Sequence, residues 1–349
     1  MSSKEHTERG RIRVTGFDPE QVRQRDPLSD WTEESGGETE GRFERAWKRF
    51  KRNRTALIGL FVVAVLTLLA VFARPITMMG VTVQPFSIAP YDPTTIMYMN
   101  PESSAGTYDS PTLSHPMGTD GDGRDLFSRV LYGGRYSISI GFIVVGLSAT
   151  FGLVYGAISG YYGGWTDEIL MRIVDTVYAF PGLILALIIV ATLGGGYWQL
   201  VAAFAIPGWI TYARLIRGEV LTIKENEYVM AAKALGARDR SVIFKHIVPN
   251  AMPPLIVYGT LNIGTVVIGV AALGFLGLGM PPGTAEWGTM LDQTRETLIQ
   301  GPGGAIPWWA TVFPGGAIFL FVMAMNMIGD GVNDAFDAQE TGIEGQGGG

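Results

Sequence analysis

The chain has 349 residues, of which 47% are hydrophobic, 17% are charged and none is cysteine. The lack of cysteine excludes a disulfide framework, thiolate catalysis and a cysteine-ligated metal. The 47 glycines follow no collagen period, and the formal net charge of -6 decides little by itself, because the charges are spread very unevenly along the chain.

Six apolar stretches contain almost none of the charged residues. Each has a length close to the ~20 residues that an α-helix needs to cross a bilayer. Together they contain a single charged side chain, that of Arg214. The stretches are 55–73, 138–160, 176–193, 198–215, 254–279 and 308–328. We therefore predict an all-α polytopic membrane protein with six transmembrane helices at these positions, which excludes a soluble globular protein.

The segment before the first stretch divides into two parts. Residues 1–42 are polar, rich in Gly and Glu and without periodicity, which predicts a disordered tail. Over 43–54, apolar residues recur at helical spacing among Lys and Arg, namely Phe43, Ala46, Trp47 and Phe50. This pattern predicts a basic helix that lies on the inner membrane surface.

The distribution of Lys and Arg orients the chain. With the N-terminus inside, 21 of the 26 Lys and Arg residues fall on the inner side, as the positive-inside rule requires. Both termini are therefore expected in the cytoplasm, with one large extracytoplasmic loop over 74–137 and an acidic flexible tail over 330–349. Six spans without a targeting segment fit a multi-pass protein of a prokaryotic plasma membrane.

Small residues and prolines punctuate the predicted spans. Gly152, Gly156 and Gly160 repeat every four residues, which lets a neighbouring helix approach closely. Three spans also contain a proline and are expected to bend, at Pro181, Pro207 and Pro314. Bundle packing accounts for most of these glycines, and hinges of a moving pathway are the alternative.

The inner loop over 216–253 is the most strongly patterned segment between two spans. Apolar residues at i, i+3, i+4 and i+7 predict a short amphipathic helix over 226–235, with a stripe formed by Tyr228, Ala231, Ala232 and Leu235. Gly236 stands where a helix end favours a left-handed glycine. Asp239 can cap a second short helix, which Pro249 is expected to stop.

A helix this short is not stable alone, so one of its faces must dock on something. One interpretation is that it docks on the membrane-proximal ends of this same chain. The other is that it docks in a groove of a separate cytoplasmic subunit, and the two central alanines, Ala231 and Ala232, favour this because they leave room for close approach.

The string EYVMAAKALGA over 227–237, followed by HIVPN over 246–250, resembles the EAA loop of permease subunits of ABC importers. In that signature an Ala-Ala pair precedes a Gly by four residues, and a Pro follows thirteen residues later. Ala232, Gly236 and Pro249 have these two spacings. We refer to residues 216–253 as the EAA-like loop.

The resemblance implies that the EAA-like loop couples this chain to ATPase subunits. The residues it assigns to that contact are Glu227, Tyr228, Ala231, Ala232, Leu235, Gly236 and Pro249. The chain departs from the signature at Met230, where an acidic residue usually precedes the alanine pair, so Glu227 is the nearest carboxylate.

Four further strings resemble the permeases of the dipeptide, oligopeptide and nickel group, and in particular the second permease of the heterodimeric pair. They are MGTDGDGRD at 117–125, YGGRYS at 132–137, EWGTML at 286–291 and NMIGDG at 326–331. The resemblance covers roughly 43–337 and implies the type I, MetI-like permease fold, in which 138–329 forms the transmembrane core.

The resemblance also implies the partners. They are a homologous second permease, two ATP-binding subunits, an extracytoplasmic binding protein that delivers peptides, and the lipid bilayer, with no nucleic acid. The chain has no G-x-x-x-x-G-K-[ST] phosphate loop. It is therefore expected to be a non-catalytic subunit that binds no cofactor, while ATP and Mg belong to the partner subunits.

Two outer segments have alternative interpretations. Asp120, Asp122 and Asp125 superficially resemble a calcium loop, but their spacing lacks its ligand order. An ordered turn in which Arg124 pairs with one of these acids is expected instead. The segment from Glu286 begins either a re-entrant or surface helix or a simple surface loop.

Asn262 and Asn326 place amides inside predicted spans. Hydrogen bonding between helices is the default role for both, and Asn262 is the candidate for lining a translocation path. The rival function is an ion- or proton-coupled secondary carrier that works without ATPase subunits. It is disfavoured because no predicted span contains a buried Asp, Glu, Lys or His of the kind that a proton relay uses, and because the two halves show no inverted repeat.

Overall fold

The computed structural model describes residues 42–78, 80–99, 105–297 and 306–337. Within these ranges, five helices are long and apolar enough to cross a membrane, and a bent helix pair supplies a sixth candidate. They are α4 (Arg54–Phe72), α5 (Leu126–Tyr162), α8 (Tyr197–Ile223), α11 (Val248–Leu273), α13 (Trp309–Asp337) and the pair α6 (Gly164–Tyr178) and α7 (Gly182–Leu193). The residues expected to form the N-terminal tail, apart from Arg42, and residues 338–349 lie outside the described residues.

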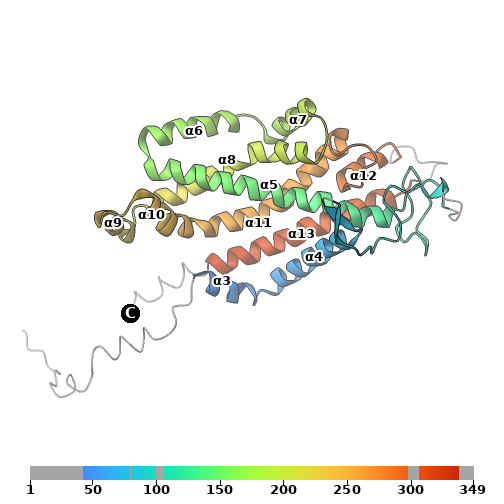
Figure 1. The fold of residues 1–349 in the computed structure, drawn as a ribbon, viewed down its shortest axis with the longest axis horizontal. Helices are drawn as coiled ribbons and strands as arrows, with labels where there is room; N and C mark the ends of the chain where they lie inside the picture. Colours follow the sequence, from blue (N-terminus) through green and yellow to red (C-terminus); the bar gives the residue numbers. More distant parts are fainter. Residues whose placement is uncertain (1–41, 79, 100–104, 298–305, 338–349) are drawn as a thin grey trace, which may run out of the picture. The chain divides into compact units, whose positions relative to one another are not determined.

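The long helices lie side by side (Figure 1). α5 packs most extensively against α8, and α13 packs against both α4 and α11. The glycine repeat of α5 makes the first of these contacts. A Cβ atom added at Gly152 would lie 2.8 Å from the Trp209 carbonyl oxygen, and one added at Gly156 would overlap the Ala213 carbonyl oxygen. The repeat therefore serves close packing, as the sequence predicts.

The basic helix at the N-terminal side is α3 (Arg42–Phe50), which is shorter than the expected 43–54. The helical chain is interrupted at 51–53, and α4 starts at Arg54 with Asn53 as its N-cap. The Asn53 side-chain oxygen accepts a hydrogen bond of 3.1 Å from the Ala56 amide. Asparagine is among the preferred N-cap residues, so the helix boundary falls at Asn53 rather than at the end of the basic run.

α5 begins twelve residues before the predicted span at 138–160, so the segment between the first two spans ends at Asp125 rather than at residue 137. The Asp125 carboxylate caps the helix, because it accepts hydrogen bonds from the Ser128 amide and hydroxyl at 2.8 and 2.6 Å. With its 37 residues, α5 is roughly 55 Å long, well beyond the ~30 Å of a hydrocarbon core.

Arg135 is a charged residue inside α5, and its guanidinium has hydrogen-bond partners there. Its guanidinium donates to the carbonyl oxygens of Ala70 and Val71 at 2.8 and 2.7 Å, and also to the carbonyl of Arg74. The last carbonyls of a helix have no partner within the helix. Arg135 therefore caps the C-terminal end of α4 and ties it to α5.

The predicted third span over 176–193 is not one helix. α6 starts at Gly164, ends at Tyr178 and is followed after a short break by α7, and the two helices are bent by 79°. Pro181 has no amide hydrogen to donate and disfavours the helical conformation of Phe180 before it. The bend expected at Pro181 is therefore present, but as a complete break between two helices, the first of which starts twelve residues before the predicted span.

The segment between α4 and α5 contains two short strands that the sequence analysis did not predict. β1 (Ile76–Met78) and β2 (Val81–Gln84) form an antiparallel hairpin in which Thr77 pairs with Thr82. A short 3-10 helix, η1 (Met97–Met99), follows. Val81 and Val83 of the hairpin are 66% and 67% exposed.

Each of the last two spans differs from the predicted 254–279 and 308–328 at one end and agrees within one residue at the other. α11 begins at Val248 and continues through a π-helical turn, η3 (Gly274–Leu278). α12 (Trp287–Thr294) follows, so the segment after Glu286 is a helix rather than a simple surface loop. α13 extends to Asp337, so the first residues of the expected tail at 330–349 are helical.

Candidate functional site

The predicted short helix of the EAA-like loop is present as α9 (Glu227–Ala234). It ends in a left-handed turn at Gly236, whose φ is 80°. The Gly236 amide donates to the Lys233 carbonyl at 2.9 Å, and the Ala237 amide donates to the Ala232 carbonyl at 3.0 Å. These two hydrogen bonds form a Schellman motif, which confirms the predicted role of Gly236 in ending the helix.

α9 has one face packed on the chain and another that the chain leaves uncovered. Val229 is fully buried, whereas Tyr228 and Leu235 are 44% and 89% exposed. Ala231 is exposed and Ala232 is half-buried. The residue that docks on the chain's own helices is thus Val229, which the sequence analysis did not single out, and most of the predicted stripe points away from them.

The second half of the EAA-like loop continues directly into the next span. α10 (Asp239–Val242) leads through a π-helical segment, η2 (Ile243–Ile247), into α11. Pro249 lies in the first turn of α11 and does not stop a helix, contrary to the prediction. Figure 1 shows α9 and α10 together at one end of α5, α8 and α11.

Along α10 and η2, two buried side chains lie on either side of an exposed aromatic one. Val242 and Ile247 are fully buried, while Phe244 is 69% exposed. Phe244 therefore adds a large aromatic side chain to the uncovered surface of the EAA-like loop. Phe244 is not among the predicted contact residues, because η2 has the wider turn of a π-helix and its residues do not follow the 3.6-residue period.

Tyr161, near the end of α5, anchors the EAA-like loop. Its hydroxyl donates a hydrogen bond of 2.6 Å to the Asp239 carboxylate, and the Lys233 ammonium lies 4.4 Å from the centre of its ring. Asp239 therefore accepts from Tyr161 rather than capping α10, whose N-cap residue is Arg238. Because Asp239 and Lys233 belong to α10 and α9, one tyrosine connects both short helices to α5.

The amide of Asn262, the candidate for lining a path, has a partner inside the chain. It donates to the Tyr212 hydroxyl at 3.0 Å, between α11 and α8. Tyr212 is fully buried, and its ring also contacts Tyr258 with 4.9 Å between the centroids. Asn262 therefore has the role expected by default for an amide in a span, which is a hydrogen bond between two helices.

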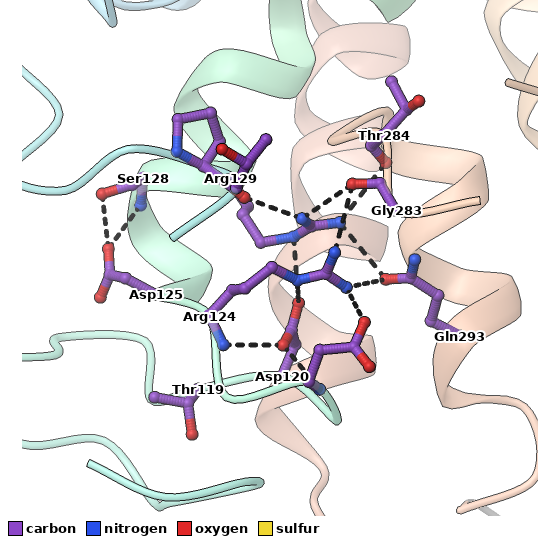
Figure 2. Close-up of polar contacts among 12 residues, drawn as sticks. Thr119, Asp120, Arg124, Asp125, Ser128, Arg129, Gly283, Thr284 and Gln293 are labelled. Atoms are coloured by element: carbon purple, nitrogen blue, oxygen red, sulfur yellow. Dashed lines mark hydrogen bonds and ion pairs between the residues drawn. The ribbon is translucent and has the colours of Figure 1, made fainter. Parts of the chain in front are cut away.

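A buried cluster of charges lies at the start of α5 (Figure 2). Asp120 is 3% exposed, and its carboxylate accepts from the Arg124 amide and from Arg124 Nε, both at 2.9 Å. Arg129, which has no exposed surface, places Nε 3.1 Å from the same carboxylate. Arg124 also pairs with Asp122. The expected turn, in which Arg124 pairs with a neighbouring acid, is therefore confirmed.

The same two arginines reach the segment between η3 and α12. Arg129 donates to the carbonyl oxygen of Gly283 at 3.1 Å, and Arg124 does so at 3.3 Å. Both guanidiniums also contact the Gln293 side-chain oxygen, at 3.3 and 3.2 Å. Figure 2 shows Gly283, Thr284 and Gln293 gathered opposite the arginines. The cluster thus fixes α12 to the start of α5.

Glu286 and Trp287 complete this connection. Glu286 is fully buried, and its carboxylate caps α12 by accepting from the amides of Gly288 and Thr289 at 3.0 and 2.8 Å. It also accepts from the Ser137 hydroxyl of α5 at 2.8 Å. The Trp287 indole donates to a carbonyl of α5 at 2.9 Å. A carboxylate at a helix N-terminus with several donors is stable without a counter-ion.

A cavity of about 760 Å³ lies beside this cluster. Its lining includes Arg74 and Asp92, which form an ion pair, together with Tyr132 and Tyr136. Burial acts to raise the pKa of Asp92, but hydrogen bonds from Thr94 and the charge of Arg74 outweigh burial and lower that pKa. Asp92 therefore stays ionised in this cavity.

Removing the charge of Asp120 is expected to destabilise the protein. The variant Asp120→Asn leaves the buried guanidinium of Arg129 without a paired carboxylate and Arg124 with Asp122 alone, at a cost of about 2 kcal/mol. The midpoint temperature for loss of monodisperse protein in detergent is expected to fall. Asp122→Asn is the matched control, because the side chain of Asp122 is 59% exposed. Equal midpoints for the two variants would contradict this role for the cluster.

The chain matches two family models. Residues 152–340 match the binding-protein-dependent transport system inner membrane component. Residues 41–106 match the N-terminal TM domain of oligopeptide transport permease C.

Known relatives align with most of the chain. The dipeptide transport system permease protein DppC of Alkalihalophilus pseudofirmus is 39% identical over 84% of this chain and 89% of its own length. The glutathione transport system permease protein GsiD of Shigella dysenteriae is 40% identical over 85% of this chain and 90% of its own length. A crystal structure of an amino acid ABC transporter with histidines is 15% identical, with a TM-score of 0.43, over 58% of this chain and 92% of that one.

The matches, the identity to relatives over nearly their full length and the apolar helices agree with the resemblance inferred from the sequence. The two family models together match residues 41–106 and 152–340. This chain belongs to the family of binding-protein-dependent transport system inner membrane components, and is a non-catalytic, multi-pass membrane permease of the ABC importer type related to dipeptide and glutathione permeases.

Proposed function

We propose that this chain is one half of a heterodimeric permease pair that imports peptides, and that two ATP-binding subunits drive it through the EAA-like loop. The observation that carries the proposal is the uncovered apolar face of α9, where Tyr228, Ala231 and Leu235 are exposed beside a fully buried Val229. A short helix that is held from behind and apolar in front fits a groove in a partner protein.

Motion of the ATP-binding subunits reaches the spans through the base of the EAA-like loop. The Tyr161 hydroxyl holds Asp239, and its ring holds Lys233. A displacement of α9 by closure of the ATP-binding subunits is therefore transmitted to α5. ATP and Mg are bound by those subunits, and the role of this chain is conformational gating between an inward and an outward opening.

The contact with the ATP-binding subunits uses the residues predicted from the signature, Glu227, Tyr228, Ala231, Ala232, Leu235, Gly236 and Pro249. Met230, which is 53% exposed, and Phe244 add apolar area to the same surface. Glu227 supplies the carboxylate that the signature usually has at the position of Met230. Asn262 supports the path indirectly, by fixing α11 against α8.

The cargo class follows from the relatives. A dipeptide permease and a glutathione permease are both similar to this chain over most of its length, and dipeptides and glutathione are short peptides. In this arrangement both termini and α3 lie on the cytoplasmic side, with α3 against the inner membrane surface. A binding protein delivers the peptide to the opposite side.

Reconstitution tests the proposal. The chain is purified with its native partners, placed in liposomes and supplied with ATP inside and with binding protein and a labelled dipeptide outside. We expect dipeptide uptake that depends on ATP, and ATP hydrolysis that rises when the binding protein carries peptide. Uptake by the isolated chain, driven by an ion or proton gradient without ATP-binding subunits, would overturn the proposal in favour of a secondary carrier.

A further inference from the structure

One face of α13 is left uncovered by the rest of the chain. Phe319 and Met323 are 64% and 49% exposed, and Asn326 and Asp330 on the same face are exposed as well. Steps of four, three and four residues place these side chains in a single stripe along the helix. The opposite side of α13 contains the buried residues Phe321, Ala324, Met325 and Ile328.

A groove of about 360 Å³ runs along this stripe. All four stripe residues line it, and Ile268 of α11 forms its other wall. The groove is apolar at Phe319 and Met323 and polar at Asn326 and Asp330. The side chains of Asn326 and Asp330 make no hydrogen bond or ion pair with any residue in the described part of the chain.

Asn326 lies inside the membrane-spanning part of α13. A Cβ atom added at Gly59 would lie 2.9 Å from the Met327 Cβ atom, so Gly59 is at the level of Met327, the residue next to Asn326. Gly59 is five residues beyond Arg54, where α4 starts, and five residues correspond to about 7 Å along a helix. Asn326 is therefore separated from that end of α4 by more than one helical turn.

An amide at this depth is not compatible with a lipid-facing surface. An amide transferred to hydrocarbon without a hydrogen-bond partner costs several kcal/mol. Polar residues in spans therefore face a bundle interior or a water-filled cavity. The stripe contains Phe319 and Met323, whereas closely packed helix contacts in membranes favour small residues, such as the glycines that α5 uses against α8.

We propose that the α11–α13 groove is a wall of the aqueous path through which the translocated peptide passes, a step that rests on the proposed function. The Asn326 amide, which both donates and accepts, pairs with the peptide backbone during passage. Asp330 attracts the ammonium group at the peptide N-terminus. The apolar wall at Phe319 and Met323 contacts peptide side chains without selecting among them.

The lack of cysteine in the natural chain makes this proposal directly testable. Single cysteines are introduced as Met323→Cys and Asn326→Cys, with Leu320→Cys as the control. Leu320 is 49% exposed, as Met323 is, but lies about a quarter turn away from the stripe. The complete transporter in inside-out and right-side-out vesicles, with and without ATP, is treated with a charged, membrane-impermeant methanethiosulfonate reagent.

We expect the cysteines at 323 and 326 to react at least about tenfold faster than the cysteine at 320 in one of these conditions, because only a hydrated thiol forms the reactive thiolate. Their modification is expected to stop dipeptide uptake. If the cysteines at 323 and 326 were unreactive in a transporter that still shows ATP-driven uptake, the groove would not line the path, while the proposed function would stand. Efficient cross-linking of the same cysteines to the homologous permease, without modification by the reagent, would instead make the stripe a subunit interface.

Discussion

Replacing Leu235 by Asp is expected to uncouple the transporter while leaving the permease folded. Leu235 is 89% exposed at the end of α9, so the charge meets only water in the isolated chain. In the proposed complex the carboxylate would enter an apolar groove. Loss of an apolar anchor from such a contact costs about 2 kcal/mol or more, which corresponds to about 30-fold weaker binding. ATP-driven uptake and retention of ATP-binding subunits on the tagged permease are the two measurements.

Leu113→Asp is the matched control for this experiment. Leu113 is also fully exposed, but it lies in the segment between α4 and α5, which is separate from the EAA-like loop. The control variant is expected to retain the ATP-binding subunits as the natural chain does. If the Leu235 variant retained them equally well and transported at the normal rate, α9 would not be the coupling element.

The positions of the spans were largely predictable because charge and apolar length are local properties of the sequence. The start of α4 lies within one residue of the predicted value. The early start of α5 could not be found in this way, because Arg129 and Arg135 look incompatible with a helix buried in a bundle. Their charges are satisfied by partners distant in sequence, such as Gly283 for Arg129 and Ala70 for Arg135.

The candidate coupling site was predictable in place but not in orientation. Helical periodicity located α9 and glycine located its end, since both depend on neighbouring residues only. Which face is free depends on the helices behind it. Val229 is apolar like Leu235, and only the packed structure distinguishes the fully buried residue from the 89% exposed one.

For the two asparagines in the spans, too, the sequence gives the position but not the surroundings. Both are amides in apolar stretches, and sequence alone favoured Asn262 for the path. The structure gives Asn262 a hydrogen bond with Tyr212, fifty positions away, and leaves Asn326 exposed beside a groove. The preference between them depends on which helix packs behind each residue, and the composition of the surrounding stretch does not encode this.

Replacing Gly156 by Leu is expected to disrupt the contact between α5 and α8 on which the other elements depend. A Cβ atom at this position would overlap the Ala213 carbonyl oxygen and lie 3.0 Å from the Ile216 Cβ atom. The first obstacle is backbone, which moves only if the whole helix moves. The two helices must therefore separate, at a cost of at least about 3 kcal/mol, and yield of monodisperse protein is expected to collapse.

Gly146→Leu separates this packing effect from the general effect of leucine in a span. Gly146 is on the same helix, and an added Cβ atom would meet nothing within 4 Å. Leucine is also a better helix former than glycine by about 1 kcal/mol, so Gly146→Leu is expected to equal or exceed the natural chain in thermal stability. If both leucine variants were equally stable, α5 and α8 would not be in backbone contact. Tyr161, which anchors the EAA-like loop, would then no longer be positioned by a fixed helix pair, and the route proposed from α9 to the spans would lose its support.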